Sequence, residues 1–256
     1  MSLAATLYLV PTPLDHGCES QTPLEQVLPL GTIRTAASLS HWISENAKST
    51  RAFLKRVDAV APLAQPIQAQ HIVELPHAAH KKGDHAGSGA RLDARALLAP
   101  ALQGHDIGLI SEAGMPAVAD PGSSVVRAAH ELNLRVTPLV GPVSILLALA
   151  ASGLNGQRFA FAGYLPQEET LRAQQLKRLQ ARALKTGETQ LFIETPYRNA
   201  ALMRSLLANL DATTRITVCS AATLPQASIL TKTVNQWRTA GGHASQGLPA
   251  IYAIGV

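Results

Sequence analysis

Short apolar, strand-like runs alternate with helical patterns along this chain of 256 residues, and this alternation constrains the fold more than any other feature. The first such run, Thr6–Val10, ends at a Pro-Thr-Pro sequence. A buried-type strand at Ile107–Ile110 is followed by a helical pattern at Ser123–Leu132. Alternating strands and helices are typical of α/β architectures, in which the carboxyl ends of strands form the ligand crevice. We therefore predict an α/β fold.

The same patterns locate the remaining elements and a domain boundary. The strands expected are Thr6–Val10, a second strand within Gly31–Ser40, Gln70–Leu75, Ile107–Ile110, Leu134–Leu139, Arg158–Tyr164, Gln190–Glu194, Ile216–Ala221, Ser228–Thr231 and Ala250–Ile254. The helices expected are residues 23–28 and 47–57, Asp93–Leu102, Ser123–Leu132, Gly141–Gly153, Glu168–Thr186, Arg198–Leu210 and a short helix around Trp237. We place the boundary at the Val140–Gly141 turn, which gives an N-terminal α/β domain of residues 1–140 and a C-terminal α/β domain of residues 141–256.

Composition excludes several protein classes. A chain that is 46% hydrophobic and 15% charged is globular, not disordered. The longest apolar run, Ile145–Ala151, is far shorter than the ~20 residues that cross a bilayer. The N-terminus lacks the basic segment of a signal peptide, and two cysteines cannot build a disulfide framework or a four-ligand zinc site. We expect a reduced cytoplasmic protein that does not bind a membrane.

Charge is divided unevenly between the two halves. Residues 1–140 carry 11 basic and 12 acidic residues, a net charge of −1, whereas residues 141–256 carry 11 basic and 5 acidic residues, a net charge of +6. In the helical segment 168–185, Arg178, Arg182 and Lys185 share one helical face. Leu176, Leu179 and Ala183 can form a buried stripe on another face. This half therefore either contacts the phosphates of a nucleic acid or presents an ordinary solvated surface.

Familiar phosphate-binding and nucleophile motifs are absent from the sequence. It contains no G-x-G-x-x-G after the first strand, no G-x-x-x-x-G-K-[ST] and no G-x-S-x-G. His71, His77, His80 and His85 lie close together, but the segment 77–89 is polar and glycine-rich, and we favour a solvated loop over a metal site. We expect no metal, and we expect Cys18 and Cys219 to be inert thiols.

Three small, Gly/Pro-rich loops each follow a predicted strand. They are Val10–Pro13, Ser111–Gly122 and Val140–Ser144. Such loops allow backbone N–H and C=O groups to approach a ligand closely, although glycine and proline also make ordinary turns. Three of them at equivalent positions favour a binding site.

The loops carry a resemblance to a known family. The stretch from Gly108 to Pro166, with S-E-A-G-M-P, D-P-G, P-L-V-G-P and G-Y-L-P, resembles the tetrapyrrole methylases, a family of S-adenosylmethionine-dependent methyltransferases. Within it, the sequence is most similar to the branch that 2′-O-methylates a cytidine of small-subunit ribosomal RNA. V-P-T-P near the N-terminus, E-N-A-K-S-T at Glu45–Thr50 and E-T-P-Y-R at Glu194–Arg198 extend the match over most of the chain.

The resemblance implies two α/β domains, S-adenosyl-L-methionine in the cleft between them, and a homodimer. By this resemblance, the N-terminal wall is lined by Pro11 and Thr12, and the amino-acid and ribose part is contacted by Ser111, Glu112, Ala113 and Gly114. The adjoining loop holds Asp120, and the second domain's wall begins with Gly141, Pro142 and Ser144. The adenine or the acceptor side is bordered by Tyr164, Leu165, Glu194 and Pro196.

Glu45 and Lys48 are the candidate catalytic residues, because the resemblance places their segment at the cleft and a ribose hydroxyl acceptor benefits from a base or a cation. Either could instead be an exposed helix charge. The chain departs from the family pattern at Asn46, Lys48, Glu112 and Met115, where the family has Asp, Arg, Asp and Thr. The sequence therefore leaves three functions open: methylation of RNA, most specifically ribosomal RNA; methylation of a tetrapyrrole or other small molecule; or a catalytically degenerate family member.

Overall fold

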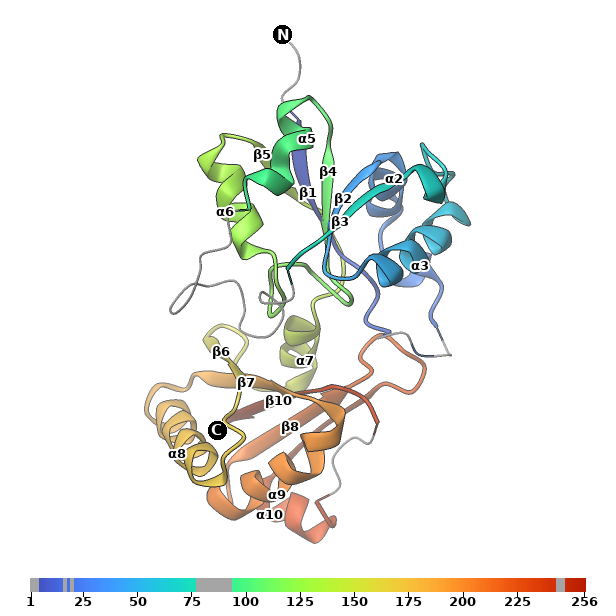
Figure 1. The fold of residues 1–256 in the computed structure, drawn as a ribbon. Coiled ribbons are helices and arrows are strands. Elements are labelled where there is room, and N and C mark those ends of the chain that lie inside the picture. Colours follow the sequence, from blue (N-terminus) through green and yellow to red (C-terminus); the bar gives the residue numbers. More distant parts are fainter. Residues whose placement is uncertain (1–4, 16–17, 19–20, 77–93, 243–246) are drawn as a thin grey trace. The chain divides into compact units, whose positions relative to one another are not determined.

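A computed structural model of the chain describes residues 5–15, 18, 21–76, 94–242 and 247–256 (Figure 1). The chain divides into two compact units, Met1–Val143 and Ser144–Val256. The first unit thus ends at Val143, whereas the sequence places the boundary at the Val140–Gly141 turn. None of the helices in the described part of the chain is long and apolar enough to cross a membrane.

The first unit is built on a parallel five-stranded sheet with the strand order β3-β2-β4-β1-β5. Its strands are β1 (Thr6–Val10), β2 (His41–Ser44), β3 (His71–Glu74), β4 (Ile107–Ile110) and β5 (Arg135–Pro138). All four residues of the central strand β4 are buried, as expected where helices cover both faces of a sheet. Because the strands are parallel, their carboxyl ends meet at one edge.

Helices cover both faces of this sheet (Figure 1). One face packs against the helical segments α1 (Leu24–Val27), α2 (Leu30–Ser38) and α3 (Ala47–Asp58), with the short 3₁₀ helix η1 (Ile67–Ala69) nearby. The other face packs against η2 (Ala96–Leu98), α5 (Ala99–Leu102) and α6 (Ser123–Glu131). The α/β architecture of the first unit is therefore three-layered.

Two predicted elements of the first unit are wrong. The segment Gly31–Ser40, expected to hold a strand, forms α2, and the strand follows it as β2. The reason is the spacing of its buried residues: Thr32 and Ile33 recur one helical turn later as Ala36 and Ala37. The continuous helix expected at residues 93–102 is instead the pair η2 and α5, because Pro100 lies in the first turn of α5 and lacks an N–H group to continue the preceding turn.

The second unit contains a mixed five-stranded sheet with the order β6-β7-β10-β8-β9, in which only the β6–β7 pair is parallel. Its strands are β6 (Phe159–Tyr164), β7 (Thr189–Glu194), β8 (Arg215–Ser220), β9 (Ser228–Thr233) and β10 (Ala250–Gly255). One face packs against α8 (Glu169–Thr186), α9 (Asn199–Asn209) and α10 (Val234–Thr239), and the other against α7 (Ser144–Ser152). Since α7 begins at Ser144, Pro142 precedes the helix that it was expected to start.

Both tryptophans are packing residues. Trp42 is buried, and its Nε1 donates a hydrogen bond of 2.8 Å to Gln70 Oε1. Its ring lies over Gly108, where an added Cβ would come within 2.5 Å of Trp42 Cζ3. Trp237 Nε1 donates to the Ile216 carbonyl at 2.9 Å.

Candidate functional site

The loops that follow β1 and β4 are joined at the carboxyl edge of the first sheet. Thr12 and Gly114 form an isolated antiparallel bridge, with Thr12 N donating to Gly114 O at 2.9 Å and Gly114 N donating to Thr12 O at 3.1 Å. Gly114 has a φ of +84°, a conformation that side chains rarely adopt. The first two predicted Gly/Pro-rich loops are therefore hydrogen-bonded to each other.

The third loop packs directly on the first. A Cβ added at Gly141 would lie 2.3 Å from Pro11 Cγ and 3.0 Å from Leu28 Cδ2, so only glycine permits this approach. The Thr32 hydroxyl donates to the Val140 carbonyl at 2.7 Å and fixes the same loop from α2. Gly141 and Pro142, which the sequence assigns to the second domain's wall, thus belong to the first unit.

Three carboxylates gather at this edge. The Glu45 carboxylate follows β2 and accepts a hydrogen bond of 3.1 Å from the Glu112 N–H in the loop after β4. Burial raises the pKa of the Asp120 carboxyl to about 7, and the charges of Glu45 and Glu112 add to the rise while the Ser111 hydroxyl opposes it. The edge therefore concentrates negative charge and suits a ligand that carries positive charge.

The loop between Glu112 and α6 holds unusual backbone conformations. Ala117 and Ala119 have φ values of 65° and 62°, and Gly122 has a φ of 131°. Ala117 N donates to the Pro121 carbonyl at 3.2 Å, which closes the loop on itself. An alanine held in the left-handed backbone conformation costs roughly 1–2 kcal/mol of folding free energy. Such strain persists where the surrounding structure holds it, and it concentrates in binding sites.

The start of α3 places the two candidate catalytic residues. Asn46 is the N-cap of α3, and its side-chain oxygen accepts from Lys48 N at 2.9 Å and Ser49 N at 3.3 Å. Asparagine and aspartate cap helices about equally well, so this departure from the family's Asp retains the cap. Lys48 is exposed in the first helical turn, where a cation opposes the helix dipole.

The remaining predicted site residues lie in the second unit, and only some of them come close together. Glu194 is buried at the end of β7, and its Oε1 accepts from Arg198 Nε at 2.8 Å and Arg198 Nη2 at 2.6 Å. The Arg198 guanidinium lies 6.0 Å from the centroid of the exposed Tyr164 ring. Leu165, by contrast, is buried in the core and has no surface to offer a ligand. Ser144 begins α7, and Pro196 begins the 3₁₀ helix η3 (Pro196–Arg198).

Sequence reasoning missed three residues around Glu194. Tyr197 and Arg198 lie within the quoted E-T-P-Y-R motif, and the i, i+4 spacing of Glu194 and Arg198 was the available signal. No sequence signal pointed to Tyr252, whose hydroxyl donates to Asn199 Oδ1 at 3.2 Å. Burial and the Glu194 charge raise the pKa of the Tyr252 hydroxyl above its usual range.

Metal and thiol chemistry find no support in the part of the chain that the structure describes. No three His, Cys, Asp or Glu side chains there are grouped so as to hold a metal ion. Of the four clustered histidines in the sequence, His77, His80 and His85 lie outside the described residues, as does the predicted loop 77–89. Burial raises the pKa of the Cys219 thiol to about 11, which agrees with an inert role.

The family model described as Tetrapyrrole (Corrin/Porphyrin) Methylases matches residues 47–237. "Ribosomal RNA small subunit methyltransferase I" of Xylella fastidiosa is 29% identical over 218 residues, which cover 85% of this chain and 68% of that protein. Proteins of the same name from Escherichia coli O157:H7 and Micromonospora olivasterospora are 36% and 30% identical over 115 and 205 residues. These alignments cover 45% and 80% of this chain, but only 39% and 56% of the relatives.

Solved structures with the same fold include two methyltransferases. Uroporphyrin-III C-methyl transferase from Thermus thermophilus, complexed with S-adenyl homocysteine, has a TM-score of 0.53 at 16% identity and covers 98% of this chain and 97% of its own. The methyltransferase CobJ has a TM-score of 0.53 at 15% identity, with 98% and 93% covered. At these identities the likeness concerns the fold, and it confirms the predicted two-domain α/β class.

Proposed function

Because this chain belongs to the tetrapyrrole (corrin/porphyrin) methylase family, we propose that it transfers a methyl group from S-adenosyl-L-methionine to ribosomal RNA, at a ribose 2′-hydroxyl. The names of the curated relatives support the RNA acceptor. The fold neighbours named for uroporphyrin-III are less than 25% identical and do not favour a tetrapyrrole acceptor. We further propose that the protein acts in the cytoplasm as a homodimer.

The carboxyl edge of the first sheet is the observation that carries this proposal. The residues there fit the cofactor: the Thr12–Gly114 bridge and the close contact of Gly141 with Pro11 hold three loops together at the edge. Glu45, Glu112 and Asp120 add carboxylates that suit a ligand with a sulfonium and an ammonium charge. When bound, S-adenosyl-L-methionine supplies an electrophilic methyl group on sulfur.

Most of the acceleration in such a displacement comes from alignment of the reacting atoms. The joined loops after β1, β4 and β5 supply it, since each is held by a direct contact with another. In this proposal the Glu45 carboxylate, which the Glu112 N–H orients, takes up the proton of a ribose hydroxyl. The exposed Lys48 stabilises the negative charge that develops on the ribose oxygen. Burial, and then the charge of Glu45, raises the pKa of the neighbouring Asp120 carboxyl.

Calorimetric titration of the purified chain with S-adenosyl-L-methionine and with S-adenosylhomocysteine tests the cofactor. We expect binding in the micromolar range, followed by transfer of labelled methyl groups to ribosomal RNA from cells that lack this gene. Labelling confined to a tetrapyrrole such as uroporphyrinogen would contradict the RNA acceptor. Absence of binding at millimolar ligand would instead identify a degenerate family member.

A further inference from the structure

Two exposed tyrosines flank one guanidinium in the second unit. Tyr164, at the end of β6, is 56% exposed, and Tyr197, in η3, is 82% exposed. The Arg198 guanidinium carbon lies 6.0 Å and 5.8 Å from the centroids of the two rings, at the outer limit of a cation–π contact. Tyr164 and Tyr197, the tyrosine pair, therefore present aromatic surface to solvent beside a fixed cation.

The position of Arg198 is fixed by the buried carboxylate of Glu194. Glu194 is only 5% exposed, and it holds Arg198 through both Nε and Nη2. The same carboxylate oxygen accepts from Thr195 N at 2.8 Å, which fixes the turn into η3. A cation held in this way keeps its orientation beside both rings without a ligand to order it.

Local charge favours the face of a base over a phosphate at the tyrosine pair. Glu194 offsets the charge of Arg198, so the pair lacks the unbalanced cation that a phosphate needs. The Glu168 carboxylate, four residues after Tyr164, accepts from Thr170 N and Leu171 N, and these backbone bonds lower its pKa and keep it ionised. Stacking on an aromatic ring needs no charge and accepts any base.

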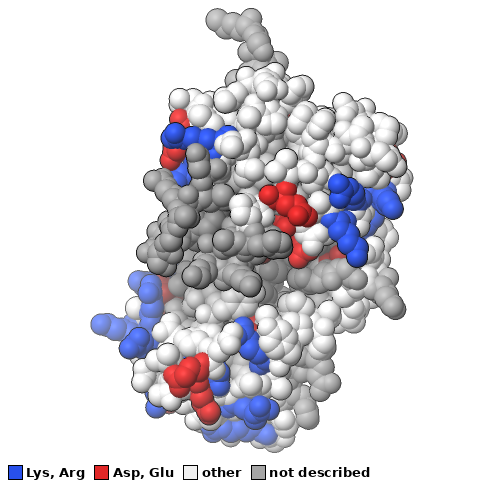
Figure 2. All heavy atoms as spheres, in the orientation of Figure 1, with Lys and Arg blue, Asp and Glu red and all other residues white. Residues whose placement is uncertain are grey.

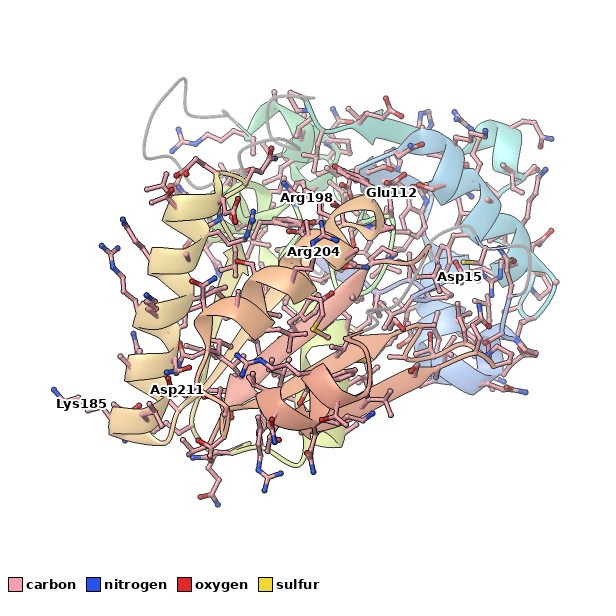
Figure 3. The ribbon with its side chains drawn as sticks, turned by 90° about the horizontal axis from the view of Figure 1, so that it is seen from below. Asp15, Glu112, Lys185, Arg198, Arg204 and Asp211 are labelled. Atoms are coloured by element: carbon pink, nitrogen blue, oxygen red, sulfur yellow. The ribbon has the colours of Figure 1, made fainter. Side chains whose placement is uncertain are left out.

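Exposed cations lie along α8, the helix that follows Tyr164 in the chain. Arg172 Nη1 donates to the Gln167 carbonyl at 2.8 Å and so ties the first turns of α8 to the loop after Tyr164. Beyond it α8 exposes Arg178 and Lys185, and Lys185 points away from the unit at the far end of the helix (Figure 3). Figure 2 shows Lys and Arg side chains on the surface of this unit, with a group of Asp and Glu side chains among them. The predicted burial of Leu176, Leu179 and Ala183 is confirmed. Of the three predicted face residues, Arg182 is paired with Glu188 at 2.6 Å, so the proposal uses Arg178 and Lys185.

We propose that the tyrosine pair is a stacking platform for unpaired bases of a single-stranded RNA segment, with the exposed cations of α8 placed to contact its phosphates. This inference rests on the proposed function, and it assigns Tyr164 to the acceptor side of the site, not to the adenine of the cofactor. Aromatic side chains beside a cationic track are the usual means of holding single strands without reading their sequence.

The experiment measures the affinity of the full chain for a fluorescent single-stranded RNA of ten nucleotides by anisotropy. We expect Tyr197→Ala and Tyr164→Ala each to weaken RNA binding about 5- to 100-fold, the effect of losing one stacked base. Tyr197→Phe, which keeps the ring, should bind within twofold of the parent. Phe159→Ala, at the other end of β6, removes an exposed aromatic ring outside the tyrosine pair and is the matched control.

Titration of the same variants with S-adenosyl-L-methionine separates the possible outcomes. Weakened RNA binding with unchanged cofactor affinity supports the platform. RNA binding equal to that of the parent in both alanine variants overturns it and leaves the proposed function standing. Loss of cofactor affinity in Tyr164→Ala also overturns it, because the ring then belongs to the cofactor site. A parent that binds cofactor but neither binds nor methylates RNA overturns the proposed acceptor itself.

Discussion

At the residue scale, Asp120 is the group whose protonation should be most visible in stability. Its pKa of about 7 when folded lies above its ordinary value of 3.8, so the folded state holds the proton more tightly, and this contribution to stability is lost as pH rises from about 4 to 7. We expect Asp120→Asn to be more stable than the parent at pH 8 by about 1–2 kcal/mol, after allowance for partial solvent screening. The gain should shrink towards pH 4. If the difference in unfolding free energy between Asp120→Asn and the parent stayed constant from pH 4 to pH 8, the raised pKa of Asp120 would be contradicted.

Gly141 should be the least replaceable residue of the candidate site. An alanine Cβ would overlap the Pro11 ring, so Gly141→Ala must displace one of the two loops. We expect it to cost about 1–3 kcal/mol in chemical denaturation and to weaken cofactor binding at least tenfold. Gly31→Ala is the matched control, since Gly31 is exposed in α2 with open space around it, and the change should stabilise by up to about 1 kcal/mol. Equal effects of the two substitutions would refute this account.

At the scale of elements, the N-terminus of α3 separates structural from catalytic roles. Asn46→Ala removes the acceptor of two backbone N–H groups and should cost about 1 kcal/mol of unfolding free energy. Asn46→Asp restores the family's residue and should leave stability within about 0.5 kcal/mol of the parent. If methyl transfer rises sharply in Asn46→Asp while stability stays the same, this position acts in catalysis and not only as a cap.

The amino edge of the first sheet carries a stack of three histidines. The His41 ring lies 4.8 Å from that of His71 and 4.5 Å from that of His105, with the Ser40 hydroxyl 3.1 Å from His41 Nδ1. Burial, then the charges of His105 and His71, lower the pKa of His41. The unfolded state thus binds protons first, and stability should fall as pH drops below about 6.5. Denaturation between pH 7.5 and 5.5 should show a shallower fall for His105→Gln than for the parent, with His130→Gln as the control.

At the scale of the whole molecule, the charge of the second half should govern the salt dependence of RNA binding. Each phosphate contact with single-stranded RNA contributes a slope of about −0.7 to the logarithm of affinity against that of salt concentration. Replacing both Arg178 and Lys185 by Gln should therefore flatten the slope by about 1.4. The same loss of charge at Arg34 and Arg135, exposed in the first unit, should leave it unchanged. Equal slopes for the two double variants would count against an RNA track on α8.

The sequence by itself determined the α/β class, the order of most elements and the family, because these depend on local periodicity and on a contiguous motif block. It placed β4 at Ile107–Ile110 and the buried stripe of α8 correctly. It failed at α2, where a short apolar run fits a strand or a helix equally well until its packing partners are known.

Only the tertiary structure decided which distant residues act together. The assignment of Gly141 to the first unit follows from its contact with Pro11, 130 residues earlier in the chain. The raised pKa of Asp120 depends on burial and then on the charge of Glu45, whose carboxylate accepts a hydrogen bond from the Glu112 N–H. The positive φ values of Ala117 and Ala119 also left no trace in the sequence, because alanine does not predict such a conformation. These features arise from contacts between segments far apart in the chain, which no local pattern encodes.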